Sequence, residues 1–305
     1  MTDGPGGGVL RVAQLNAGSL IEPNWADRRH EIVAWLQQLR ADVVCLEEVW
    51  QDDNTPNTAE WIATHASGLD YHCAFGGAPF AAGVWPDPSL LFGSAVLSRW
   101  PIEDFTHHPL PIGPGGNAFV QGVPWELIHA RTAGLDVFAC HLAAAPTDGL
   151  HRRLQVLAID ELIRQARGDR DAISLVGPRR LLEGMPVILC GDFNAEPDSD
   201  EIRFLCSLTP LEGRTAYYQD AWRAAGEGLG LTQDWRSNEL AASMNVHPKR
   251  IDYVFVGDAF QRRDGAGRVL TASLAFHEPL TGIVASDHFG VCVDVLWPQR
   301  PGIAG

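Results

Sequence analysis

The sequence lacks any apolar run that approaches the roughly 20 residues needed to cross a membrane. It also lacks the basic segment and following apolar stretch that mark a secretory signal; residues 1–8 are instead rich in glycine. We therefore expect residues 1–8 to form a flexible tail. We also expect a soluble, cytoplasmic protein without a membrane-spanning segment.

Cysteine pairs separated by two residues are absent, although the chain has six cysteines. Such pairs are typical of structural zinc sites and redox centres. Four of the cysteines lie within apolar, strand-like runs: Cys45, Cys140, Cys190 and Cys292. A chain of 305 residues needs no disulfide to stabilise its core, so we predict buried, reduced thiols.

Basic residues are scarce: 23 lysines and arginines stand against 38 aspartates and glutamates, giving a net charge of −15. Polyphosphate backbones repel an acidic protein, which disfavours non-specific binding to nucleic acid. The arginines present are scattered, as at Arg179-Arg180 and Arg262-Arg263. A phosphorylated small molecule or a lipid headgroup fits this charge balance better. Nothing in the sequence implies an obligate protein partner.

Internal repeats and low-complexity blocks are also absent, and 46% of the residues are hydrophobic, enough for a large core. Polar residues that follow apolar runs are spread from Asn16 to His288, across nearly the whole chain. Neither half would carry a complete site, so we predict one domain over residues 9–305.

Strand-like and helix-like patterns of apolar residues alternate along this domain. We predict helices over residues 27–39, 58–66, 150–167 and 199–208. We predict strands over residues 9–16, 43–46, 187–190, 250–256, 269–276 and 291–296, a strand and turn over 93–102, and a hairpin formed by 119–132 and 135–141. Turn signals such as Gly76-Gly77 indicate loops through most of residues 71–125, and residues 169–185 and 211–248 are also expected to be irregular.

The most informative stretch runs from Val187 to Pro197. Its apolar start is typical of a strand buried on both faces, and Gly191 permits a sharp turn. Asp192 and Asn194 follow, and residues two apart in an extended chain point the same way. Oxygen-bearing side chains placed together suit a hard divalent cation or a phosphoryl group. Taken alone, the stretch is more typical of an Asx turn.

Polar residues end other apolar runs as well. These residues are Asn16, Glu47 and Glu48, His141, Asp252, and Asp287 with His288. Two adjacent acids after a buried run are unusual, because an unpaired charge beside a core is costly. A single histidine at such a position is more often a hydrogen-bonded structural residue.

Seven short motifs occur in a characteristic order: Leu15-Asn16, Leu46-Glu47-Glu48-Val49, Ala95-Val96-Leu97-Ser98-Arg99, Cys140-His141-Leu142, Gly191-Asp192-Phe193-Asn194, Arg250-Ile251-Asp252-Tyr253 and Ser286-Asp287-His288. In this order they resemble the endonuclease/exonuclease/phosphatase superfamily of metal-dependent phosphohydrolases, over residues 9–297. The resemblance implies a four-layer α/β/β/α sandwich, two stacked mixed β-sheets flanked by helices. It departs at Glu47, where the family usually has glutamine, and the tyrosine that some nuclease branches use near the phosphate is not identified.

The resemblance also implies a metal site. Glu48 would bind Mg²⁺ or Mn²⁺, and Asn16 and Asp287 would be further ligands or hydrogen-bonding partners of the ligands. Asp192 would orient or deprotonate the attacking water, or bind a second metal. Asn194 would donate a hydrogen bond to a phosphate oxygen.

Two histidines complete the implied catalytic set. His141 and His288 would stabilise charge in the transition state or act as acid and base, and Asp252 would hold His288 by a hydrogen bond. Arg99 and Arg250 are predicted to form structural ion pairs rather than to bind substrate.

Three functions remain open at this point. The first is hydrolysis of a phosphoester on a small molecule or lipid headgroup, which the acidic charge and the aromatic loops between Phe75 and Trp125 favour. The second is a metal-dependent endo- or exonuclease, which needs a basic groove and stacking platforms. The third is an inactive binding protein on the same fold, which the full set of acids and histidines disfavours.

Overall fold

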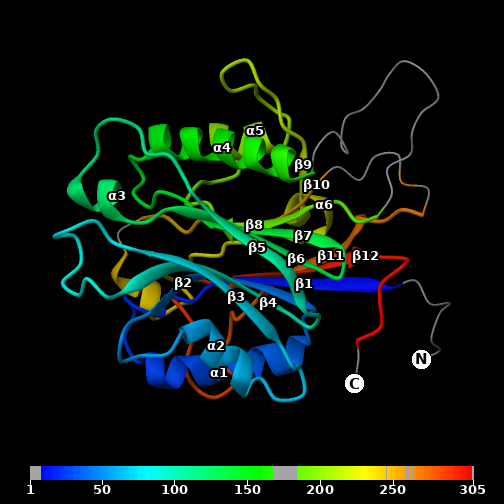
Figure 1. The fold of residues 1–305 in the computed structure, drawn as a ribbon, viewed down its shortest axis with the longest axis horizontal. Helices are drawn as coiled ribbons and strands as arrows, with labels where there is room; N and C mark the ends of the chain where they lie inside the picture. Colours follow the sequence, from blue (N-terminus) through cyan, green and yellow to red (C-terminus); the bar gives the residue numbers. More distant parts are fainter. Residues whose placement is uncertain (1–7, 168–183, 245, 258–261, 263, 304–305) are drawn as a thin grey trace.

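The computed structural model describes residues 8–167, 184–244, 246–257, 262 and 264–303. Most of the expected tail and of the polar stretch 169–185 lies outside the described residues. Within the described part, two six-stranded mixed sheets stack face to face with helices on both outer sides (Figure 1). The predicted four-layer sandwich is confirmed.

The two sheets share one pattern of strand directions: the two central strands of each sheet are parallel, and all other neighbouring strands are antiparallel. The first sheet consists, in spatial order, of β11 (Val269–Ala275), β12 (Gly290–Leu296), β1 (Val9–Asn16), β2 (Val43–Gln51), β4 (Leu91–Ser98) and β3 (His72–Pro79). The second consists of β5 (Ile102–Pro109), β6 (Glu126–Thr132), β7 (Leu135–His141), β8 (Ile188–Asp192), β10 (Asp252–Gly257) and β9 (Tyr218–Asp220).

The helices form the outer layers. They are α1 (Trp25–Leu39), α2 (Thr58–His65), α3 (Ala118–Gly122), α4 (Gly149–Arg167), α5 (Asp200–Leu205) and α6 (Ala221–Ala225), with a short 3-10 helix at Leu240–Ser243. Helices α1 and α2 cover the first sheet, and α4 and α5 cover the second (Figure 1). No helix among the described residues combines the length and apolarity that a membrane crossing requires.

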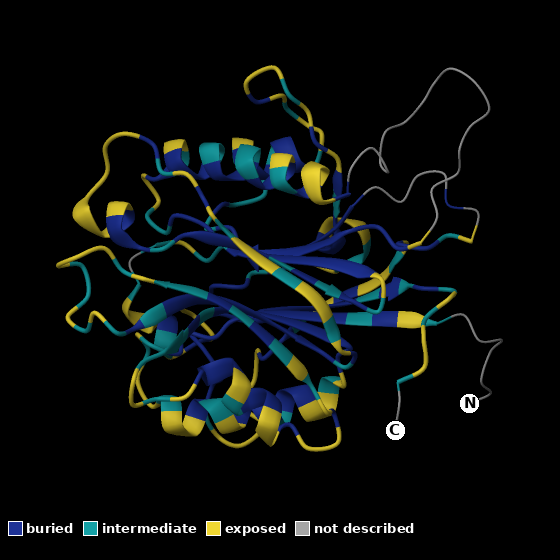
Figure 2. Cartoon of the chain, in the orientation of Figure 1, coloured by how far each residue is buried: buried dark blue, intermediate teal, exposed yellow. Residues whose placement is uncertain are grey.

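Three apolar clusters fill the spaces between the four layers. One lies between the sheets, one under α1 and α2, and one under α4 and α5. Figure 2 shows the buried residues in these layers and the exposed ones on the outer helix surfaces. The predicted thiols are confirmed as free, and Cys45, Cys140, Cys190 and Cys292 are buried.

Two predictions for residues 71–132 are wrong. Residues 119–122, expected to begin a strand, belong to α3, because the Asn117 side chain accepts a hydrogen bond from Val120 N at 2.9 Å and caps a helix there. Gly76 and Gly77, expected in a turn, lie within β3. A Cβ on Gly76 would come within 2.3 Å of Ile128 Cγ2, so this glycine lets the two sheets approach closely.

Within the described chain, Arg250 forms the structural ion pair predicted for it, and Arg99 does not. Arg250 donates to both oxygens of Asp220, at 3.1 and 2.8 Å, so its predicted structural ion pair is confirmed. Arg99 instead donates from Nε to the Leu69 carbonyl at 3.3 Å. No ion pair of Arg99 occurs among the described residues, and the prediction is wrong for this arginine.

Candidate active site

The site is the polar end of the layer between the two sheets. Alternate residues of a strand face alternate sides. In β1, Leu10 and Val12 belong to the central apolar cluster, so Asn16 at the end of the strand faces the second sheet. In β8, Cys190 belongs to the same cluster and Asp192 follows it two residues later. The strand-end residues that obey the same alternation on neighbouring strands are Glu47, His141 and Asp252.

Regular alternation would turn Glu48 away from Glu47, but an irregularity in β2 brings the Glu48 carboxylate to Asn16, whose Nδ2 donates to it at 3.1 Å. The register with β4 shifts between Leu46 and Val49, and Glu48 has a left-handed φ of 54°. Glu47 is fully buried, whereas Glu48 is partly exposed. Burial raises the pKa of Glu48, and the negative charge of Asp287 raises it further against the opposing effect of His141.

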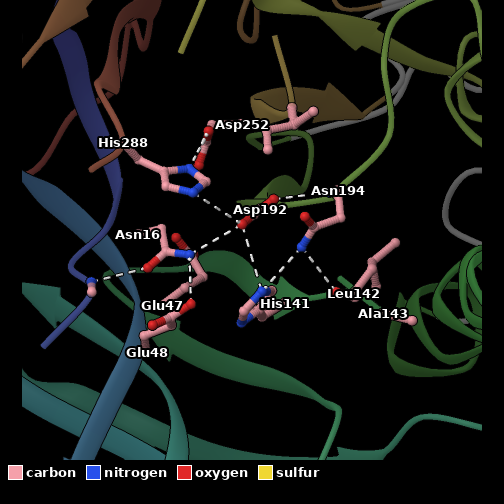
Figure 3. Close-up of polar contacts among 12 residues, drawn as sticks. Asn16, Glu47, Glu48, His141, Leu142, Ala143, Asp192, Asn194, Asp252 and His288 are labelled. Atoms are coloured by element: carbon pink, nitrogen blue, oxygen red, sulfur yellow. Dashed lines mark hydrogen bonds and ion pairs between the residues drawn. The ribbon is translucent and has the colours of Figure 1, made fainter. Parts of the chain in front are cut away.

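Asp192 lies at the centre of the site (Figure 3). Its Oδ2 accepts a hydrogen bond from Asn16 Nδ2 at 3.1 Å and lies 3.5 Å from His141 Nε2 and 3.9 Å from His288 Nε2. The preceding Gly191 is required by space, because a Cβ there would lie 2.0 Å from the Cys140 carbonyl oxygen. One carboxylate therefore joins residues from both sheets.

Asn194 forms the turn and also belongs to the site. Its backbone N–H donates to Asp192 Oδ1 at 2.8 Å, an Asx turn, and its φ of 48° is left-handed. Because the chain is no longer extended, its side chain points to His141 rather than alongside Asp192. Asn194 Nδ2 donates to His141 Nε2 and to the Leu142 carbonyl, both at 3.1 Å. The turn and site interpretations of this stretch are thus compatible.

His288 is fixed by acids around both of its ring nitrogens. Nδ1 donates to Asp252 Oδ2 at 2.9 Å, and Nε2 lies 3.8 Å from Asp287 Oδ2. Burial alone would lower the pKa of His288, but the negative charges of Asp252, Asp287 and Asp192 raise it well above its ordinary value. Burial raises the pKa of Asp252, and His288 opposes that rise. The acids around the ring therefore favour protonation of the imidazole, against the effect of burial.

The eight residues to which the resemblance assigns a catalytic or metal-binding role come together in one network of hydrogen bonds and ion pairs. Figure 3 labels all of them except Asp287. Asn16 connects Glu48 and Asp192, since its Nδ2 donates to both carboxylates at 3.1 Å. Its Oδ1 accepts from Gly18 N at 3.0 Å and points away from them. This geometry is that of a partner that orients the acids.

The donor set suits a hard divalent cation. Among the described residues, no lysine or arginine forms an ion pair with Glu48, Asp192, Asp252 or Asp287. Ligand atoms of Asp192, Asp252 and His288 lie within 4.8 Å of one another. Asp252 and His288 of this group are already bonded to each other, and the carboxylates of Glu48 and Asp287 lie beside it, on Asn16 and His288 respectively.

Two further residues contact the site that the sequence analysis did not identify. Gln14 Nε2 donates to Asp252 Oδ1 at 2.9 Å, and Gln233 Nε2 lies 3.2 Å from His288 Nε2. Gln14 precedes Asn16 by two residues on β1, so strand alternation was a usable signal for it. Gln233 comes from a loop, and no local pattern points to it.

Known proteins share both sequence and fold with this chain. It is 27% identical over 188 residues to protein angel homolog 2 of Danio rerio, which covers 60% of this chain and 30% of that protein. It is 24% identical over 222 residues to protein angel homolog 2 of Mus musculus, covering 71% and 36%. The chain thus spans about a third of the length of these curated relatives.

Among solved structures, an endonuclease/exonuclease/phosphatase from Beutenbergia cavernae superposes with a TM-score of 0.65 at 23% identity, covering 96% of this chain and 72% of that one. D. rerio TDP2, solved in complex with a single-strand DNA product, has a TM-score of 0.65 at 19% identity, covering 94% and 98%. The model of the Endonuclease/Exonuclease/phosphatase family matches residues 13–288. The chain belongs to the endonuclease/exonuclease/phosphatase family.

Proposed function

We propose that this protein hydrolyses phosphoester bonds with the help of Mg²⁺ or Mn²⁺. The observation that carries the proposal is the convergence of Glu48, Asp192 and Asp287 beside two histidines, with no arginine or lysine paired to the acids within the described chain. Clustered buried carboxylates repel one another, and a divalent cation is the partner that offsets this cost. Membership of the family supports the same chemistry.

The residues of the site divide the work of hydrolysis. A cation held by Glu48, Asp192 and Asp287 would neutralise the phosphate and acidify a water molecule. Asp192 Oδ2, which faces the centre of the site, accepts the proton of the attacking water. His288, whose Nδ1 donates to Asp252 and whose Nε2 faces Asp192, stabilises charge on the phosphoryl oxygens. Asn194 Nδ2 would donate to one of those oxygens by giving up its contact with His141 Nε2.

Chelation tests the proposal directly. With bis(p-nitrophenyl) phosphate as substrate, EDTA is expected to lower the rate at least ~100-fold, because cation catalysis contributes several kcal/mol. Added Mg²⁺ or Mn²⁺ should restore it. Activity that persists after exhaustive chelation would exclude the metal mechanism, and no activity on any phosphoester with either ion would favour the inactive binding protein.

The substrate we favour is a phosphorylated small molecule or lipid headgroup. An aromatic cluster packs beside the site: Trp125 makes an edge-on contact with His141 at 5.3 Å, and Phe80 stacks on Trp85 at 5.4 Å and packs on Phe92 at 5.2 Å. Trp85 and Phe80 are only partly buried. These rings support an apolar wall for a compact substrate, as the loop composition predicted.

Nucleic acid is the second candidate, because of a hollow of about 660 Å³ lined by α5, α6 and the loop after α6. Arg203 and Arg223 line it, and neither forms an ion pair among the described residues. The hollow includes Pro197, three residues after Asn194, so its edge lies within about 11 Å of that residue's backbone. The TDP2 structure with its single-strand DNA product makes this candidate worth testing.

The double substitution of Arg203 and Arg223 by glutamine separates the two candidates. If the substrate is a strand, KM for an oligonucleotide should rise about tenfold and the salt dependence of binding should weaken by roughly two phosphate contacts, since each contact releases bound counterions. Turnover of bis(p-nitrophenyl) phosphate should not change. Arg40→Gln, an exposed arginine at the end of α1, is the matched control. An unchanged oligonucleotide KM would favour the small substrate.

A further inference from the structure

A buried chain of hydrogen bonds runs behind the site from one sheet to the other. Gln14 Nε2, on β1, donates to Glu47 Oε2 of β2 at 2.7 Å and to Asp252 Oδ1 of β10 at 2.9 Å. All three side chains are 0% exposed. The two hydrogens of one amide therefore connect an acid of the first sheet with an acid of the second.

This arrangement holds the Asp252 carboxylate at both of its oxygens. Oδ1 accepts from Gln14, and Oδ2 accepts from His288 Nδ1 at 2.9 Å. A carboxylate bonded at one oxygen can rotate about its own axis, whereas one bonded at both is fixed. The plane of Asp252 then sets the direction of the His288 ring, whose Nε2 faces Asp192 and Asp287.

Stability does not account for the Gln14–Glu47 contact. Gln14 Oε1 and Glu47 Oε1 are both buried, and neither has a hydrogen-bond partner among the described residues. Buried polar atoms without partners destabilise a fold, and a pair of apolar side chains of the same size would avoid that cost. Regular alternation along β2 directs Glu47 to this position, and the irregularity at Glu48 lets the next acid contact Asn16 instead.

We propose that Gln14 and Glu47 form a positioning pair that orients Asp252 and His288 for phosphoester hydrolysis. The inference rests on the proposed function. Glu47 holds the Gln14 amide, the amide fixes Asp252, and Asp252 aims the imidazole. Neither residue of the pair contacts the substrate.

The test is a pair of variants, Gln14→Met and the double variant Gln14→Met/Glu47→Met. Gln14→Met should lower kcat about 10- to 100-fold, the usual effect of removing a partner that orients an active-site residue, with KM changed less than about twofold. It should also lower Tm, because Glu47 and Asp252 lose their donor. The double variant should recover part of the lost Tm, because Glu47 no longer lies buried without a donor, although Asp252 Oδ1 still lacks one, and kcat should stay low.

A kcat that recovers together with Tm in the double variant would show that the pair is merely structural and would overturn the proposal. So would an unchanged kcat in Gln14→Met. Gln37→Met, an exposed glutamine on α1, controls for the substitution itself.

A spectroscopic signal keeps this inference separate from the proposed function. In NMR spectra the Nδ1 proton of His288, shared with Asp252, should give a strongly downfield resonance that shifts or broadens in Gln14→Met and not in Gln37→Met. A wild-type protein without activity on any phosphoester would refute the proposed function, while this resonance would still test the positioning pair. If this resonance does not change in Gln14→Met, the proposed positioning role of Gln14 and Glu47 is wrong.

Discussion

Replacing Glu48 by glutamine is expected to lower kcat/KM by about 10³-fold at millimolar Mg²⁺, the loss that corresponds to roughly 4 kcal/mol of cation-dependent stabilisation. The substitution is conservative for the neighbours, because the glutamine Oε1 still accepts the hydrogen bond from Asn16 Nδ2 that Glu48 Oε1 accepts at 3.1 Å. It removes only the charge. Steady-state kinetics across a Mg²⁺ titration give the measurement.

The Glu48→Gln substitution should not lower the stability of the fold. Burial and the charge of Asp287 raise the pKa of Glu48, so the ionised carboxylate is less favourable in the folded protein than in the unfolded chain. In EDTA, wild-type stability should therefore fall as pH rises from the ordinary glutamate pKa of about 4.3 through the raised folded value. The Glu48→Gln variant should lack this loss and unfold at an equal or higher temperature.

Binding of the cation supplies a readout that does not depend on activity. Mg²⁺ should raise the Tm of the wild type, because it binds only the folded state, and should raise that of Glu48→Gln much less. Glu60→Gln, an exposed glutamate on α2, should behave as the wild type in every assay. A Glu48→Gln variant that loses Tm in EDTA in proportion to its activity would assign Glu48 a structural role instead.

The fold was largely predictable because its buried strands are short apolar runs that end in polar residues, a pattern that a single sequence displays. The run from Val187 to Cys190 and its continuation into Asp192 indicate both a strand and the side on which the acid lies. Edge strands carry a weaker signal. β3 contains Gly76 and Gly77, which are typical of a turn; the approach of Ile128 from the other sheet explains Gly76, and the Phe75 ring lies over Gly77.

The convergence of the candidate site was predictable for a similar reason, since parallel and antiparallel pairing brings strand ends to one rim. The register pairs Asn16 with Glu47, and Asp192 with both His141 and Asp252. Side-chain directions outside regular strands were not predictable. The left-handed conformations of Glu48 and Asn194 depend on the irregularity in β2 and on the Asx turn.

The largest loss of stability is expected from Arg28→Met. Arg28, on α1, is 0% exposed, and its five donor contacts all go to backbone carbonyls. These carbonyls belong to Ala17, Gly18, Glu22 and Pro23 in the loop after β1, and to Ala285 before Asp287. One guanidinium thus ties together the two segments that follow Asn16 and precede Asp287.

Removing it should cost about 3–5 kcal/mol of unfolding free energy, as for breaking a buried charged network, because five carbonyls lose their donor at once and three of these hydrogen bonds are buried. Urea unfolding followed by circular dichroism measures the loss. Arg28→Lys should recover only part of it, since an ammonium has three donors and lacks the planar fork that reaches both segments.

The neighbouring arginine provides the control. Arg29 makes one backbone contact, to the Ala26 carbonyl at 3.2 Å, and lies over the Trp61 ring at 4.1 Å on the partly exposed surface of α1. Arg29→Met should therefore cost no more than about 1 kcal/mol. Equal losses at both positions would mean that helix propensity or surface charge governs α1, because only Arg28 reaches the two loops. A larger loss at Arg28, accompanied by weaker Mg²⁺ stabilisation, would instead show that the same guanidinium supports the positions of Asn16 and Asp287.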